Sequence, residues 1–360
     1  MTANAPLIAV LPGDGIGVEV TEAALFVLER VARRHGIGLR TETLEAGAFA
    51  YQRTGTALSD ETFRRAEGAD AILLGAMGWP GIRYPDGTEI APQIDLRFRL
   101  GLYAGVRPIR AIPGVPLPLA DPRAKDIDLV ILRESTEGLF WARGRGEVIE
   151  DREARDTMVI TRATTERLTR FAFRLAERRA ARRGKPGRVT LVDKANVFTS
   201  MAFMRKVFDE TAREFPGVAA DHHYVDAMAL DLVRRPWDFD VLPTENMFGD
   251  ILSDLGAGLI GGMGYAPSAD IGDGHAVFQP SHGTGPDIAG KGIANPTATI
   301  LSVAMMLDWL SEQGAGQAWA DAATELDRAV DAAFAGGLRS AEFGGVGTRE
   351  VAHAIADRIG

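Results

Sequence analysis

Residues 11–20 read LPGDGIGVEV and follow the apolar run 7–10, LIAV. Because a helical pattern of apolar residues comes next, the stretch predicts a strand, a glycine-rich turn and a helix. Such a turn can hold the pyrophosphate of a dinucleotide, but the Rossmann fingerprint requires G-x-G-x-x-G, and the glycines here are spaced G-x-G-x-G. Asp14 also places a carboxylate where a phosphate needs amide donors. We therefore interpret the turn as a tight connection in which glycine supplies a positive φ.

Apolar runs alternate with helical patterns along the rest of the chain, which is typical of an α/β architecture. The expected strands are 7–11, 71–74, 128–132, 189–192 and 239–242. The expected helices are 18–34, 157–183, 196–214, 250–259 and 296–313. A length of 360 residues predicts two domains. Five prolines within 106–122 suit a crossing between them, and the glycine-dense zone 256–274 suits the return.

Composition excludes several classes of protein. The chain has no cysteine, which excludes disulfides, thiolate metal sites and a cysteine nucleophile. A net charge of -9 disfavours general binding to nucleic acids or anionic membranes. The arginine-rich segment 178–188 is either a nucleic-acid patch or a solvated helix face, and we favour the solvated face. No window is apolar enough to span a membrane, and the start MTANAPLIAV lacks the features of a signal peptide, so we expect a cytoplasmic protein.

Two acids in the stretch 244–254, TENMFGDILSD, indicate a metal site. Asp250 and Asp254 are four residues apart, on one face of the predicted helix. Their charges repel unless a cation lies between them, and hard divalent cations take oxygen ligands. The alternative is two solvated helix acids, but the apolar neighbours argue against exposure of both. Asp226 interrupts another apolar run and is either a third metal ligand or a member of a structural ion pair.

Several cations could act on an acidic substrate. Lys194 follows the expected strand 189–192, and ligands bind at the carboxyl ends of strands in open α/β sheets. It is either a surface lysine or a base whose pKa is lowered by burial or by a metal. Arg97, Arg107 and Arg133 lie outside the basic segment. Because arginine binds carboxylates through a planar fork, three of them near a metal indicate a substrate with more than one carboxylate.

A long loop near the carboxyl end, 281–295, reads SHGTGPDIAGKGIAN. It is either a structural turn or a loop that wraps a flat ligand, since glycine allows close approach of the backbone. Asp287 could accept hydrogen bonds from both ribose hydroxyls of an adenosine and would repel a 2′-phosphate. The loop therefore favours NAD over NADP.

Together these stretches resemble the β-decarboxylating dehydrogenase family, which includes 3-isopropylmalate, isocitrate, homoisocitrate and tartrate/D-malate dehydrogenases. The resemblance rests on GDGIG (13–17), NMFGDILSD (246–254) and HGTGPDIAGKGIANP (282–296), covers nearly the whole chain, and is strongest to the isopropylmalate branch. It implies an α/β fold that is not Rossmann. A large, discontinuous cofactor-binding domain, 1–103 and 255–360, would enclose a smaller domain, 104–254, with the metal and catalytic residues and the dimer interface.

The resemblance also implies an activity: NAD- and Mg²⁺- or Mn²⁺-dependent oxidation and decarboxylation of a malate-type 2-hydroxy di- or tricarboxylic acid. The roles it implies are catalytic for Lys194 and Asp226, substrate-binding for Gln93, Arg97, Arg107 and Arg133, metal-binding for Asp226, Asp250 and Asp254, and cofactor-binding for His282, Gly283, Thr284, Gly285, Asp287, Ile288 and Asn295. The pair Asp287-Ile288 matches NAD-type members, since NADP-type members carry Lys-Tyr. Family members are homodimers in which the residues like Lys194 and Asp226 reach the partner's site.

Three departures from the family leave alternatives open. Phe140 stands where the family usually has the tyrosine that protonates the enol. Another group or water then donates the proton, or that step is slow, or the enzyme oxidises without full decarboxylation. Gln279 replaces a glutamate, and Gln93 replaces an apolar residue that would bury an isopropyl group. Ile90 and Ala91 lack the serine hydroxyl expected for isocitrate. Besides 3-isopropylmalate, the substrate could be tartrate, D-malate, isocitrate or homoisocitrate, or the chain could be a catalytically impaired ligand-binding paralogue.

Overall fold

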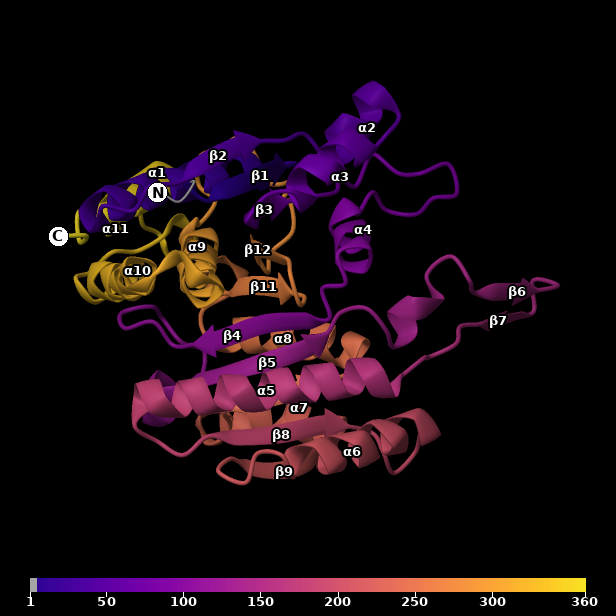
Figure 1. Ribbon diagram of the computed structural model, residues 1–360. Coiled ribbons are helices and arrows are strands. Elements are labelled where there is room, and N and C mark those ends of the chain that lie inside the picture. Colours follow the sequence, from indigo (N-terminus) through magenta and orange to yellow (C-terminus); the bar gives the residue numbers. More distant parts are fainter. Residues whose placement is uncertain (1–4) are drawn as a thin grey trace.

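The computed structural model describes residues 5–360 as an α/β fold built on one large mixed sheet (Figure 1). Within these residues the sheet has ten strands, in the order β2-β1-β3-β12-β11-β4-β5-β10-β8-β9. Residues 1–4 lie outside the described residues. They belong to the stretch MTANAPLIAV, which lacks the features of a signal peptide. The strands are β1 (Leu7–Gly13), β2 (Arg40–Thr43), β3 (Ala71–Ala76), β4 (Ala104–Arg110), β5 (Asp128–Glu134), β8 (Arg188–Asp193), β9 (Ala219–Tyr224), β10 (Val241–Thr244), β11 (Pro267–Ile271) and β12 (Ala276–Pro280).

Two parallel halves meet at an antiparallel centre. Pairing is parallel among β2, β1, β3 and β12 and again among β5, β10, β8 and β9, whereas β12–β11, β11–β4 and β4–β5 are antiparallel. One half combines strands from the two ends of the chain, and the other is built from 104–244. The sheet continues without a break between the halves, so the domain boundaries near 104 and 254 stay a prediction.

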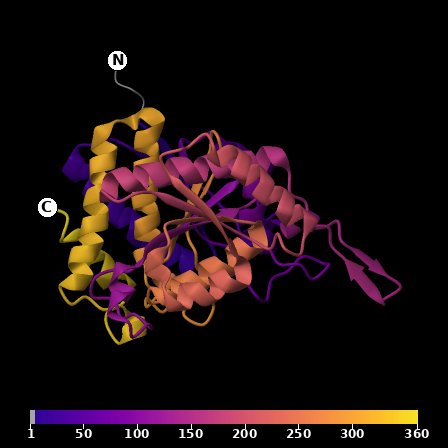
Figure 2. The ribbon, with the colours of Figure 1, turned by 90° about the horizontal axis from the view of Figure 1, so that it is seen from below.

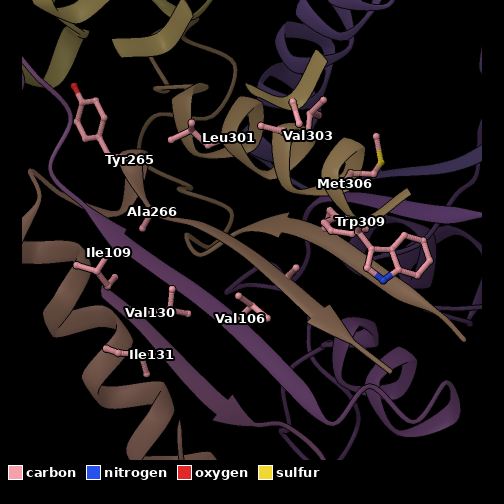
Figure 3. Packing of buried hydrophobic residues seen from close by; sticks show 14 of the residues in the cluster. Val106, Ile109, Val130, Ile131, Tyr265, Ala266, Leu301, Val303, Met306 and Trp309 are labelled. Carbon is pink, nitrogen blue, oxygen red and sulfur yellow. The ribbon is translucent and has the colours of Figure 1, made fainter. Parts of the chain in front are cut away.

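Helices cover both faces of the sheet. They are α1 (Ile16–His35), α2 (Ala48–Thr54), α3 (Asp60–Glu67), α4 (Pro92–Arg99), α5 (Arg162–Arg183), α6 (Thr199–Ala212), α7 (Val225–Arg234), α8 (Asn246–Leu259), α9 (Thr297–Leu310), α10 (Gln317–Ala335) and α11 (Thr348–Ala356). Figure 2 shows α5 and α8 on opposite faces of the strands. One cluster of buried apolar residues runs across the centre, from Ile109 and Val130 on β4 and β5 to Leu301 and Val303 on α9 (Figure 3). Each fully buried aliphatic side chain contributes roughly 1.5–3 kcal/mol.

The proline-rich stretch 106–122 does not begin as a crossing segment, because its first residues belong to strand β4. Pro108 faces Val130 on β5, and the N–H of Val130 donates to the carbonyl of Asp240 at 2.7 Å. The two residues therefore form a pair without mutual hydrogen bonds. Pairing between β4 and β11 ends at Val106. No neighbouring strand of the described sheet accepts a hydrogen bond from position 108. Strand β4 therefore tolerates a proline there, which has no N–H to donate.

A hairpin that was not predicted from the sequence projects from the body of the molecule. Its strands are β6 (Glu147–Ile149) and β7 (Glu153–Arg155), and all six residues are exposed (Figures 1 and 2). The turn between them places Glu150 and Asp151 in the left-handed region. Within residues 5–360, the hairpin is the part of the fold that packs least against the rest.

Candidate active site

The glycine-rich turn that opens the chain is a structural device, as its spacing predicted. Asp14 is buried and accepts hydrogen bonds from the N–H groups of Ala48 at 2.6 Å, Phe49 at 2.9 Å and Gly78 at 2.9 Å. Its carboxylate thereby anchors the start of α2, where the helix dipole favours a negative charge. The next residue but one, Ile16, donates its N–H to the carbonyl of Thr284 at 2.9 Å. The turn thus fixes the position of the late loop.

A cavity of about 160 Å³ brings together residues that lie far apart in the sequence. It opens between α4, α8 and the carboxyl ends of β3 and β12. The predicted site residues that line it are Gln93, Arg97, Arg107, Arg133, Asp250, Asp254, His282 and Gly283. A larger cavity of about 730 Å³ lies between α1 and α11 but holds none of these arginines or aspartates. We therefore assign the candidate active site to the smaller cavity.

Asp270 of β11 organises two of the arginines and was missed by the sequence analysis. Its Oδ2 atom accepts from Arg97 Nε at 2.9 Å and from Gln279 Nε2 at 2.8 Å, and its Oδ1 atom lies 3.6 Å from an Arg107 nitrogen. Burial opposes ionisation, but the charges of Arg97, Arg107 and Arg133 outweigh it and hold the pKa of Asp270 below its usual range. Gln279 fits here because its amide can donate, whereas a glutamate would repel Asp270. The sequence signal that could have identified Asp270 is its position as an acid within the mostly apolar stretch 267–271.

Arg133 is held at the end of β5 by groups from α8 and by an aromatic ring. Its Nε atom donates to Asn246 Oδ1 at 2.8 Å, and its NH1 group pairs with Asp250. The guanidinium carbon lies 4.9 Å from the centre of the Phe140 ring, within the range of a cation–π interaction. Burial and the nearby charge of Arg97 lower the pKa of Arg133 to about 10. An anion in the cavity would offset this clustering of positive charge.

Asp250 and Asp254 lie one turn apart on α8, as predicted. Glu245 fixes the start of this helix by accepting from the N–H groups of Met247 at 3.1 Å and Phe248 at 3.2 Å. Burial and the charge of Asp250 raise the pKa of Asp254. A divalent cation between the two carboxylates would relieve that repulsion, so this pair fits a metal.

The expectation that apolar neighbours shield these acids is wrong for a single chain. The Asp250 side chain is 50% exposed. Ile251, one of the apolar neighbours, is 60% exposed. Ile251 points to solvent because α8 turns only part of its apolar surface toward the sheet.

Lys194 and Asp226 do not line the cavity of their own chain. Lys194 Nζ lies 2.6 Å from Asp226 Oδ1, and this hydrogen bond lowers the pKa of Asp226. The expectation that Asp226 is a buried acid is wrong, since its side chain is 68% exposed. On α7, Met228 and Leu232 are buried, whereas Leu230 and Val233 are exposed and form an uncovered apolar face. In residues 5–360 of one chain, no three His, Asp or Glu side chains are grouped to hold a metal.

The loop 281–295 is held firmly although it contains no regular structure. Ile288 and Ala294 pack with Ile16 and Val20 of α1. Asn295 Oδ1 accepts from the N–H of Thr297 at 3.1 Å at the start of α9. Such a loop is in place before any ligand binds, which reduces the entropy lost on binding.

Polar groups of this loop remain available to a ligand. Burial lowers the pKa of His282, and its Nε2 atom has no hydrogen-bond partner among the described residues. Asp287 is exposed at the outer side of the loop. The structure thus leaves the cofactor-binding roles of these residues as predictions.

The sequence matches the isocitrate/isopropylmalate dehydrogenase family over residues 7–359. The chain belongs to this family. It is 42% identical over 354 residues, 98% of each chain, to a 3-isopropylmalate/3-methylmalate dehydrogenase of Methanocaldococcus jannaschii. It is 44% identical over 353 residues, 96% of this chain and 95% of the other, to a 3-isopropylmalate dehydrogenase of Moorella thermoacetica.

Solved structures of the isocitrate/isopropylmalate dehydrogenase family have the same fold. An isocitrate dehydrogenase from Methylococcus capsulatus matches with a TM-score of 0.85 and 37% identity, over 98% of this chain and 99% of that chain. An apo β-decarboxylating dehydrogenase from Thermococcus kodakarensis matches with a TM-score of 0.79 and 37% identity, over 98% and 96%. The predicted family and fold class are confirmed. The protein is an oxidoreductase for a hydroxy acid, with isopropylmalate dehydrogenase-like oxidative decarboxylation as its activity.

The arginines of the basic segment 178–188 are engaged with acids. Arg178 pairs with Glu312 at 3.1 Å, Arg179 with Asp240 at 2.8 Å and Arg182 with Asp308 at 2.7 Å. These pairs favour the interpretation of a solvated helix face. Among the described residues, no helix has the length and apolar character needed to cross a membrane.

Proposed function

We propose that this family member is an NAD-dependent dehydrogenase that uses Mg²⁺ or Mn²⁺ to oxidise and decarboxylate a 3-substituted malate, as 3-isopropylmalate dehydrogenases do. The observation that carries the proposal is one cavity lined by Arg97, Arg107, Arg133, Asp250 and Asp254. With Asp270 behind the arginines, the formal charges of these groups cancel. A divalent cation would add two positive charges, which two substrate carboxylates would balance.

Each group then has one task. The arginines bind the carboxylates through paired hydrogen bonds and fix the position of C2. Asp250 and Asp254 hold the metal. A bound metal would supply polarisation of the hydroxyl oxygen, and bound NAD would supply the hydride acceptor. Lys194 takes the hydroxyl proton, because an amine beside a cation can act as a general base.

We propose further that the protein is a homodimer in which Lys194 and Asp226 complete the partner's cavity. Both lie outside their own cavity and next to an uncovered apolar face. The exposed apolar side chains are Val197 and Phe198, which follow Lys194 in the chain, Leu230 and Val233 on α7, and Ile251 on α8. A second copy related by a two-fold axis would cover this face and bring Asp226 to the Asp250–Asp254 pair. The exposed β6–β7 hairpin offers unpaired strand edges to the same copy.

A tartrate-type substrate is the second candidate, favoured by Gln93. Its Oε1 atom is buried at the cavity and has no hydrogen-bond partner among the described residues. A polar group at C3 would satisfy this amide, whereas an isopropyl group would leave it unpaired.

The test is a substrate panel with NAD and NADP side by side. Malate, tartrate, isocitrate and 3-isopropylmalate are each supplied with Mn²⁺, and NADH or NADPH formation is followed by absorbance. We expect NADH from at least one substrate and its loss on addition of a chelator. Silence across the panel would favour an impaired ligand-binding paralogue, and turnover that survives chelation would contradict the metal site.

A further inference from the structure

The proposed reaction needs a proton donor that the cavity lining does not supply. Loss of CO₂ leaves an electron pair shared between C3 and the oxygen on C2, and C3 must then gain a proton. Phe140 lies against Arg133 but its ring has no exchangeable proton. Arginine does not give up its proton in ordinary proteins, and ionised aspartates carry none. The lining also contains Ser253, Ser281 and His282. Serine hydroxyls are very weak acids, and burial lowers the pKa of His282, which disfavours its protonated form. The proposed dimer would add Lys194 and its neighbours to these groups.

Tyr224 is placed beside the residues that would enter the partner's cavity. It ends β9 and precedes Asp226 by two residues, at the start of α7. The Nζ atom of Lys194 lies 5.8 Å from the centre of its ring, and the guanidinium carbon of Arg205 lies 5.2 Å from it. The ring is 39% exposed. Tyr224 therefore lies on the same open face as Lys194 and Asp226.

The position of this ring is fixed by a buried anchor. Asp193, which precedes Lys194, is fully buried and accepts from Arg205 Nε at 2.8 Å and from its NH2 group at 2.7 Å. This two-pronged pair holds the guanidinium against one side of the Tyr224 ring. The phenol thus keeps a defined place relative to Lys194, as a proton donor requires.

The other four tyrosines make contacts in other parts of the molecule. Tyr51 and Tyr84 pack against each other, with ring centres 5.1 Å apart. Tyr103 packs edge-on against Phe171. Tyr265 is buried, and its hydroxyl is hydrogen-bonded to Ser340 at 2.8 Å. Among the described tyrosines, Tyr224 alone contacts Lys194.

We propose that Tyr224 is the proton donor to C3, acting in the partner's cavity together with Lys194. The phenol O–H bond breaks, a C–H bond forms at C3, and the electron pair stays on the phenolate, which takes a proton back from water. The phenol hydroxyl is a group that can donate a proton. The inference rests on the proposed decarboxylation. In it, Phe140 does not donate a proton, and its ring instead supports the guanidinium of Arg133.

The test removes only the hydroxyl. Tyr224→Phe keeps the ring that packs on Arg205, and Tyr84→Phe is the matched control outside the site. We expect Tyr224→Phe to lower kcat roughly 10²-fold with little change in KM. NADH should still form in a single turnover. Exchange of the C3 protons of the 2-oxo acid product in D₂O should be lost in parallel. Adding Phe140→Tyr to Tyr224→Phe should restore both readouts, because a phenol again reaches the enol.

The outcomes separate this inference from the proposed function. Full turnover and exchange by Tyr224→Phe, beside an active wild-type enzyme, would overturn the role of Tyr224 alone. Loss of activity that the second tyrosine does not rescue, with an unchanged unfolding midpoint, would also overturn it by assigning Tyr224 to the support of Lys194. A wild-type enzyme that forms no NADH with any acid in the panel would overturn the proposed function as well.

Discussion

Gly15 lies directly against Thr284: a β-carbon at position 15 would stand 2.2 Å from the Thr284 carbonyl oxygen. That oxygen also accepts the N–H of Ile16 at 2.9 Å. The first glycine-rich turn and the late glycine-rich loop are therefore one structural unit, although almost 270 residues separate them in the sequence. The loop expected to hold the adenosine is thus positioned by the first glycine-rich turn.

The first prediction follows from this contact. Gly15 has a φ of +58° and Gly36 has a φ of +62°, but nothing lies within 4 Å of a β-carbon built on Gly36. Gly36 has a ψ of 25° and is in the left-handed region, so alanine there costs about 1–2 kcal/mol of stability. Gly15 has a ψ of -129°, a conformation that only glycine adopts readily, so alanine there should cost more. Only Gly15→Ala should also displace Thr284, so we expect weaker NAD binding in that variant alone. Urea unfolding and NAD titration measure the two effects, and equal NAD affinity in both variants would contradict the coupling.

The second prediction concerns the acid behind the arginines. Asp270→Asn keeps the shape of the side chain but leaves Arg97 and Arg107 without their buried counter-charge. We expect a loss of about 3–5 kcal/mol in the free energy of unfolding, the usual cost of breaking a buried pair. The exposed pair of Asp121 with Arg123 is the control, and Asp121→Asn should have no measurable effect. Urea unfolding curves that coincide for the two variants would show that the arginines do not need Asp270.

The third prediction is a pH dependence of stability at Glu134, where β5 ends. Burial raises the pKa of Glu134 to about 7, although it accepts three hydrogen bonds, from the N–H and hydroxyl of Thr136 and from the N–H of Glu137. Because the folded pKa lies above the ordinary value of 4.5, protonation favours the folded state. The contribution of this group is complete below about pH 4.5 and is lost as pH rises through about 7.

Glu134→Gln removes the titrating group and so reveals its contribution. Relative to wild type, the variant should gain on the order of 3 kcal/mol between about pH 5 and pH 8. Any constant cost of the amide cancels in this comparison. Chemical denaturation at both pH values is the measurement. A difference between the two proteins that does not change with pH would show that the three hydrogen bonds keep Glu134 ionised.

The fourth prediction tests the shared site by subunit mixing. Lys194→Met and Arg133→Gln should each abolish activity, since each removes one part of both sites in a dimer. If Lys194 serves the partner's cavity, a mixed dimer contains one site with neither substitution. Random mixing after denaturation and refolding should then restore roughly a quarter of the wild-type activity, because half of the dimers are mixed and each has one intact site.

Mixing Arg133→Gln with Asp254→Asn is the matched control for this experiment. Both residues line the same cavity of one chain, so a mixed dimer has no intact site. Restoration in the control, or none in the Lys194→Met mixture, would contradict the exchange of Lys194 between subunits.

Secondary structure could be predicted where burial imposes a period on the sequence. The runs at 7–11, 71–74, 128–132, 189–192 and 239–242 correspond to β1, β3, β5, β8 and β10. The same logic failed at the edge strand β9 and at the central strand β4. β9 (Ala219–Tyr224) is mostly exposed, so its sequence AADHHY shows no apolar pattern. β4 was hidden by Pro108, whose tolerance depends on where the neighbouring strand β11 stops pairing.

The sequence by itself determined the residue types of the site and the local geometry of one part of it. Asp250 and Asp254 share a helix face because helical spacing is set by the backbone, which the local sequence controls. The family also followed from the sequence, since the two long motifs combine those acids with the glycine-rich loop in a fixed order.

Only the tertiary structure decided which of these residues meet. Arg97 and Arg107 come from a helix and a strand and meet at Asp270, whereas Arg133, from another strand, pairs with Asp250. That these arginines line one cavity depends on the strand order of the sheet. The same packing leaves Lys194 and Asp226 outside the cavity of their own chain. Long-range contacts of this kind arise from the burial of shared apolar surface across the whole chain, which no local pattern records.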